Sequence, residues 1–195
     1  MNLHAPSDHK PYVSFVDNSL WRALAWIGVA LQALAAVVAR WSENLGGLWI
    51  ILGFLAGSVV FLLAVRRLPS LLAFVAILAA TINAGGWAWN WYVAFIWFDE
   101  LVHTYSPFAI VAVLMFWFWR AGWVTARPAS GKWVILAAGC GFVLGVAWEI
   151  VEAFFIDLRL QDTIVDLMLD TIGASLGGWL SGWVIQRMGG IRRAD

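Results

Sequence analysis

Charged residues are scarce in this chain, and cysteine is almost absent. Only 12% of the 195 residues are Asp, Glu, Lys or Arg, whereas 63% are hydrophobic, and the mean hydropathy is +0.82. Soluble domains carry about 25% charged residues, so this composition excludes an ordinary water-soluble domain. The single cysteine, Cys140, excludes an intrachain disulfide. No dense Lys/Arg block stands beside aromatic residues, and the net charge is zero, which argues against nucleic acid as a partner.

Long apolar runs dominate the chain instead. One crossing of a bilayer needs about 20 residues, and the first run is too long for the apolar region of a signal peptide. The runs predict an all-α integral membrane protein, a single transmembrane domain over residues 1–195 that contacts membrane lipids. Its spans are expected at about residues 20–38, 48–65, 71–87, 99–119, 133–156 and 163–185.

The basic residues predict the orientation of this six-helix bundle. Ten of the twelve Lys and Arg lie in the amino-terminal segment and in the segments that follow the second, fourth and sixth spans. Only Arg40 and Arg159 lie on the other side. Because positively charged loops stay in the cytoplasm, the N-terminus and the C-terminus are both predicted to be cytoplasmic. An even number of spans agrees with that orientation.

The acidic residues gather at the opposite, outer ends of the last three spans. Eight of the twelve lie between residues 99 and 170. Their spacings of three or four residues place each set on one stripe of its helix. With the one nearby histidine, the candidate metal ligands are Asp99, His103, Glu149, Glu152, Asp162, Asp166 and Asp170.

A carboxylate at membrane depth is costly and by default marks a functional site. The outer side offers too few cations to balance this cluster, so the acids are either protonated or compensated by a bound metal ion. Carboxylates with one imidazole suit Mg²⁺, Mn²⁺, Fe²⁺ or Zn²⁺. Two simpler interpretations stay open: Asp99 and Asp162 as helix caps, and His103 as a core histidine that donates to a neighbouring carboxylate.

Three motifs carry a resemblance to a known family. They are Phe98-Asp99-Glu100-Leu101-Val102-His103, Trp148-Glu149-Ile150-Val151-Glu152, and the run from Asp162 to Ala174 that contains Asp166, Asp170 and Gly173. In this combination the chain resembles the YjdF-like bacterial inner-membrane proteins and, more distantly, the VanZ-like family. The resemblance implies a multi-pass protein of the bacterial cell inner membrane with a site at these residues. Ser106-Pro107 follows the histidine where the YjdF-like pattern has Ser-Gly.

Three functions fit this pattern, and whether the protein is an enzyme stays open. The first is a metal-dependent enzyme at the outer leaflet, in which a divalent cation activates water against a lipid or cell-envelope substrate. The second is a structural or partner-binding membrane protein without catalysis. The third is cation or proton binding or transport, which the apolar inner halves of all six spans disfavour. The sequence identifies no protein partner and no oligomeric state.

Overall fold

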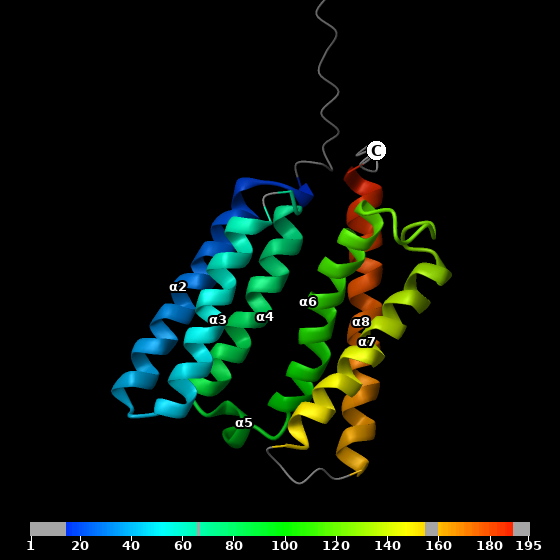
Figure 1. Ribbon diagram of the computed structural model, residues 1–195. Coiled ribbons are helices and arrows are strands. Elements are labelled where there is room, and N and C mark those ends of the chain that lie inside the picture. The colour runs from blue at the N-terminus through cyan, green and yellow to red at the C-terminus, as the bar shows by residue number, and fades with distance from the viewer. Residues whose placement is uncertain (1–14, 66, 155–159, 189–195) are drawn as a thin grey trace, which may run out of the picture.

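The computed structural model describes residues 15–65, 67–154 and 160–188, which form helices and no strand (Figure 1). The predicted all-α class is therefore confirmed for these residues. Arg159, which the sequence analysis placed on the outer side, lies outside the described residues. The helices are α2 (Ser19–Trp41), α3 (Leu45–Ala64), α4 (Ser70–Ala88), the short α5 (Trp91–Ala94), α6 (Phe98–Arg120), α7 (Gly131–Glu152) and α8 (Leu160–Met188).

Five of these helices are long and apolar enough to cross a membrane, namely α2, α3, α4, α6 and α7. They overlap with the first five predicted spans, although the fifth span was predicted to continue to residue 156 and α7 ends at Glu152. The sixth predicted span lies within α8, which has 29 residues but carries three aspartates in its first half, and it is not among the five. The start of α2 and the end of α8 lie at the same end of the bundle (Figure 1).

Polar side chains and one proline set the helix starts. The side chains of Asn18, Asn44 and Ser130 accept hydrogen bonds from backbone N–H groups in the first turns of α2, α3 and α7. Such caps satisfy amide groups that have no partner inside the helix. Pro69 precedes α4, as the break after the second span predicted. Helices satisfy most of their backbone hydrogen bonds internally, as hydrocarbon surroundings require, although Pro107 within α6 has no N–H to donate.

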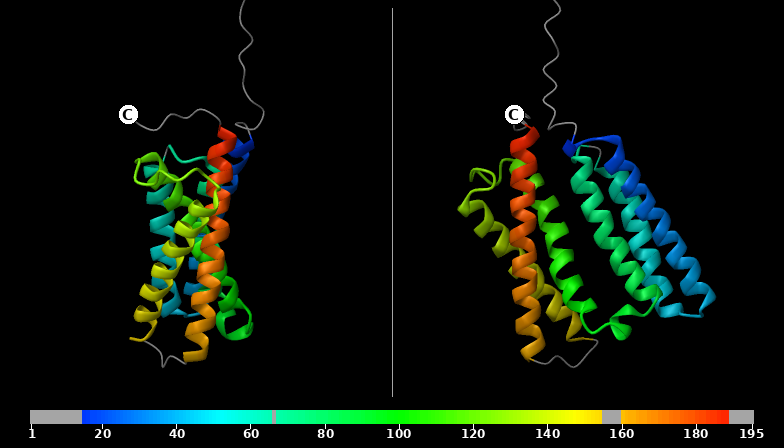
Figure 2. Two further views of the ribbon diagram at one scale, coloured as in Figure 1. Left: turned by 90° about the vertical axis from the view of Figure 1, so that its right-hand side faces the viewer. Right: turned by 180° about the vertical axis from the view of Figure 1, so that it is seen from behind.

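The helices pack as two groups of three. In the first group α4 packs against α2 and α3, and in the second α8 packs against α6 and α7. Contacts between α4 and α6 join the groups, and the short α5 connects these two helices at one end (Figure 2). The closely packed pairs do not include α3 with α6. The two groups are therefore joined mainly along a single pair of helices.

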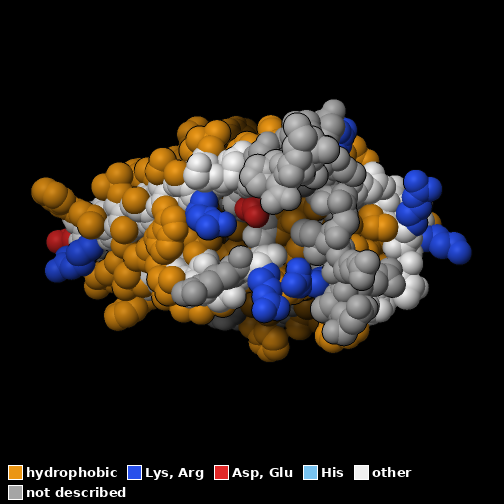
Figure 3. Space-filling model, turned by 90° about the horizontal axis from the view of Figure 1, so that it is seen from above, with side chains coloured by type: hydrophobic (Ala, Val, Ile, Leu, Met, Phe, Trp, Pro, Cys, Tyr) orange, Lys and Arg blue, Asp and Glu red, His pale blue; other side chains and the backbone are white. Residues whose placement is uncertain are grey.

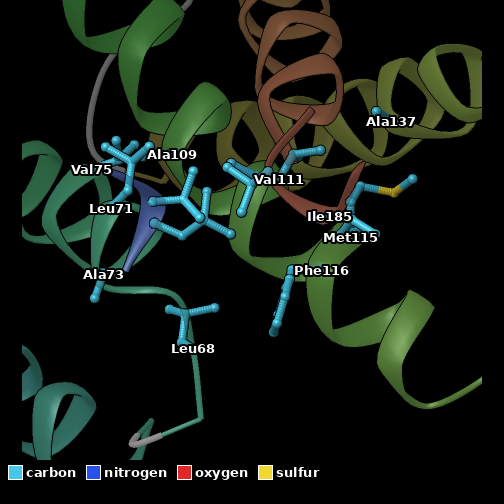
Figure 4. Close-up of a cluster of buried hydrophobic side chains, with 14 of the residues drawn as sticks. Leu68, Leu71, Ala73, Val75, Ala109, Val111, Met115, Phe116, Ala137 and Ile185 are labelled. Atoms are coloured by element: carbon cyan, nitrogen blue, oxygen red, sulfur yellow. The ribbon is translucent and has the colours of Figure 1, made fainter. Parts of the chain in front are cut away.

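Small residues let α8 approach its neighbours closely. A Cβ atom on Gly173 or Gly177 would collide with the backbone carbonyls of Thr104 and Phe108 in α6, and one on Gly141 would collide with Ala174. These glycines allow close packing within the bundle. The largest buried hydrophobic cluster lies between α4, α6, α7 and α8, toward the end where α8 terminates (Figure 4).

The two ends of the bundle carry opposite charge. Lys and Arg side chains gather at the end where α2 begins and α8 ends (Figure 3). Those in the described part of the chain are Arg22, Arg67, Arg120, Arg127, Lys132 and Arg187. At the other end Arg40 is the only described Lys or Arg, whereas eight of the nine described Asp and Glu lie there. The buried core is thus near the basic end and the acidic residues are at the opposite end.

Candidate metal centre

His103 stands at the centre of the acidic cluster. It lies one and a half turns into α6, and only 4% of its surface is exposed. Its Nδ1 lies 3.2 Å from Oδ1 of Asp170 in α8, a residue that is 2% exposed. With Nδ1–H donating to that carboxylate, the lone pair of the imidazole is on Nε2. This is the arrangement by which a carboxylate orients a histidine for metal binding.

The free nitrogen of His103 faces further acids. Its Nε2 is 4.0 Å from Oδ1 of Asp99, one helical turn earlier, and Asp99 is half exposed. Asp166, one turn before Asp170 on α8, joins them: one ligand atom from each of Asp99, His103 and Asp166 lies within 4.8 Å of the other two. The first and third of the predicted acidic stripes therefore meet at this histidine.

The second stripe reaches His103 from α7. One ligand atom from each of His103, Glu149 and Glu152 also lies within 4.8 Å of the other two. Glu149 is 5% exposed, and neither of its carboxylate oxygens has a hydrogen-bond partner among the described residues. Both glutamates lie in the last turn of α7, where the helix dipole disfavours negative charge. A buried carboxylate without any partner requires compensation by a proton or a cation.

The structure gives the seven predicted ligands different positions. Asp99, His103, Glu149, Glu152 and Asp166 form the two groups. Asp170 belongs to neither group and contacts His103 instead, and its Oδ2 has no partner in the described part of the chain. Asp162 is exposed in the first turn of α8 and also belongs to neither. Asp99 is not the N-cap residue of α6, a position that Trp97 occupies, but it lies in the first turn, where its charge favours the positive helix end.

A polar network beside the cluster was not fully predicted from the sequence. The hydroxyl of Tyr92, in α5, donates to Oδ1 of Asn83 at 2.9 Å, and Nδ2 of Asn83 donates to Oγ of Ser106 at 3.1 Å. Burial, followed by the charges of Asp99 and Glu152, raises the pKa of Tyr92 above its ordinary value. Tyr92 therefore stays a neutral donor next to the acids. No spacing signal in the sequence links α5 to the cluster.

The acid cluster adjoins a cavity between α4, α6 and α7. His103 and Asp170 contribute to its wall, and its volume is about 510 Å³, within the range of about 300–1,000 Å³ that is typical of ligand sites. Asn83 and Ser106 line it as well, and most of the remaining lining side chains are apolar. The buried imidazole is thus accessible from a space large enough for part of a substrate.

Comparison with known protein families, curated proteins and solved structures finds no match to this chain. The fold and the site therefore define a class: a helical membrane protein with a buried His/Asp/Glu group that is able to hold a metal ion.

The contact between His103 and Asp170 predicts that alanine variants of Asp170 and Asp99 differ in stability in the presence of a chelator. Asp170→Ala leaves a buried imidazole N–H without an acceptor and should lower the unfolding free energy by about 1–3 kcal/mol. Asp99→Ala removes a half-exposed carboxylate 4.0 Å away and should cost at most about 1 kcal/mol. Denaturant unfolding of the purified protein in detergent measures both values.

Asp170→Asn serves as the control, because its amide oxygen still accepts from Nδ1 and the variant should unfold closer to wild type than Asp170→Ala does. Equal stability of Asp170→Ala and wild type would contradict the assigned contact.

Proposed function

We propose that this chain is a six-span membrane protein that binds a divalent cation among α6, α7 and α8. The observation that carries the proposal is the pair of orphaned oxygens on Glu149, buried in the same group of ligand atoms as His103. Carboxylates in this number repel one another, and Arg40 is the only described Lys or Arg at this end. A divalent cation supplies the missing charge and partners at once.

The donor set fits a hard or borderline cation. His103 would provide one nitrogen, while Glu149, Glu152, Asp99 and Asp166 would provide oxygens, a combination that suits Mg²⁺, Mn²⁺, Fe²⁺ or Zn²⁺. Asp170 orients the imidazole and holds the proton on Nδ1. Because the ligand atoms come from three helices, the ion would also tie α6, α7 and α8 together at their acidic ends.

An enzyme is the function that this centre supports best. A bound cation polarises a substrate oxygen and makes bound water a better nucleophile at neutral pH. A carboxylate of the cluster that does not bind the ion would accept a proton from this water. Tyr92 remains protonated and donates a hydrogen bond at the edge of the cluster. We infer hydrolysis of a lipid or cell-envelope substrate at the outer leaflet, with the cavity beside His103 admitting it.

The opposite charges of the two ends support the orientation. The basic end would face the cytoplasm, with both termini, and the acidic centre would face the outside. With α8 as the sixth span, the chain would start and finish on the same side. Membership of the YjdF-like inner-membrane proteins is part of this proposal, and it rests on the three motifs and on the meeting of those motifs at His103.

Metal binding predicts a melting response. Chelation should lower the melting temperature of the purified protein, and one of the four metals should restore it, because a ligand of the native state stabilises the fold. Glu149→Gln and Asp166→Asn should each weaken that response by removing a ligand oxygen. Differential scanning fluorimetry over a metal titration measures the shift.

Glu43→Gln is the matched control, since Glu43 is exposed at the same end of the bundle but outside the cluster. It should respond to chelator as wild type does. If elemental analysis finds no metal, and chelator and added cations leave melting unchanged, the cluster is protonated rather than metal-bound. Glu149→Gln should then be neutral or stabilising, and a structural function would replace the enzymatic one.

The orientation predicts which loops react from outside the cell. In a Cys140→Ala background, a cysteine replacing Glu43 should react with a membrane-impermeant maleimide in intact cells, whereas a cysteine replacing Arg127 should react only after the cells are opened. The reason is that these residues lie at opposite ends of the bundle. Labelling of the Arg127 position in intact cells would reverse the proposed topology.

A further inference from the structure

A second cavity continues the first one away from the acid cluster. It has a volume of about 550 Å³ and lies between α3, α4 and α6. The two cavities share four lining residues, Phe54, Ala76, Ala80 and Ile110. We call the two together the apolar groove. Ser58 is the one polar side chain among the residues that line its second part.

The length of the groove corresponds to one leaflet of a bilayer. His103 lines the groove at its acidic end, and Leu114 lines it at the far end, eleven residues later on α6. At a helical rise of about 1.5 Å per residue, the two are roughly 16 Å apart along the axis. The hydrocarbon core of a bilayer is about 30 Å thick, so the groove covers about half of it.

The groove is open because α3 and α6, which flank it, do not pack closely against each other. Gly53 and Gly57 line it from α3, and a Cβ atom on either glycine would meet nothing within 4 Å. Ile110 lines it from α6 and is 47% exposed. In a membrane the medium beside these residues is lipid hydrocarbon. A lipid chain can therefore enter from the side without passing through water.

The acidic end of the groove changes from apolar to polar within one helical turn. Ser106 and Asn83 line the groove beside His103 and are already linked to Tyr92. A lipid chain in the groove would bring the first oxygen atoms of its headgroup to these donors and to the imidazole. The apolar part of the groove thus suits a hydrocarbon chain, and its acidic end suits a headgroup. An outer-leaflet lipid presents its chain and its headgroup in the same order.

We propose that the substrate is a membrane lipid, one of whose hydrocarbon chains lies in the apolar groove while its headgroup oxygens reach the centre at His103. This inference rests on the proposed function and specifies its substrate class. The groove suits a long hydrocarbon chain, because its walls on α3, α4, α6 and α7 are mostly apolar and its length corresponds to one leaflet. The headgroup would be held by the cation and by the Asn83–Ser106 pair.

Photolabelling tests the proposal directly. The probe is a lysophospholipid with a diazirine near the end of its palmitoyl chain, mixed into phosphatidylcholine vesicles that contain the purified protein. After illumination, mass spectrometry of peptides should find adducts concentrated on the groove walls, at Gly53–Phe61 of α3 and at Val113 and Leu114 of α6. Adducts spread evenly over the lipid-facing sides of all helices would overturn the proposal.

Two variants make the test specific. Gly53→Leu combined with Gly57→Leu narrows the groove, and the new Cβ atoms have open space beside them, so the fold should persist while groove adducts fall severalfold. Gly139→Leu is the matched control, because Gly139 is an exposed helical glycine of α7 that also has open space beside it and does not line the groove. Groove labelling that survives the double substitution would contradict the assigned position of the chain.

Labelling and the response to chelator are separate measurements. Labelling that is spread evenly over the helices, together with a normal melting response, overturns the lipid inference and leaves the metal centre supported. Groove-specific labelling without any melting response overturns the metal centre and leaves chain binding in the groove supported.

Discussion

The burial of carboxylates inside an apolar helical bundle is the constraint on which the rest of this structure depends. Glu149 and Asp170 lie almost without exposure at the junction of three helices, and three of their four carboxylate oxygens have no hydrogen-bond partner in the described structure. Hydrocarbon provides no water to stabilise such charges. The imidazole of His103 satisfies one oxygen. The others require compensation by a proton or a cation, and a divalent cation would supply both charge and coordination.

This constraint explains why the basic and acidic halves of the bundle differ. The hydrophobic core lies mainly toward the basic half, and glycine-mediated contacts follow α8 from Gly173 to Gly182, so tight packing supplies the stability. At the acidic half the same helices bring polar groups together at a cost in stability, a pattern typical of functional sites. The loose junction between the two groups of three helices leaves the apolar groove, which leads from lipid to the acidic centre. The position of the site and its access route thus follow from the same arrangement of helices.

Much of the fold was predictable from hydropathy, because a bilayer forces apolar runs of about 20 residues into helices. Helical spacing also identified the stripes of Asp99 with His103 and of Asp166 with Asp170. Spacing along one helix does not determine which helices meet, so the contact between His103 and Asp170, 67 residues apart, required the structure. The same holds for Tyr92. Gly53 and Gly57 have the spacing of a packing motif but line open space, because α3 and α6 do not pack closely.

The central claim is that a divalent cation lies between α6, α7 and α8. Anomalous diffraction from crystals grown with Mn²⁺ tests it most directly. The account predicts one strong anomalous peak, within coordination distance of Nε2 of His103 and of a carboxylate oxygen of Glu149, which Glu149→Gln weakens. A map without an anomalous peak among these side chains, in crystals grown with excess Mn²⁺, would contradict the account.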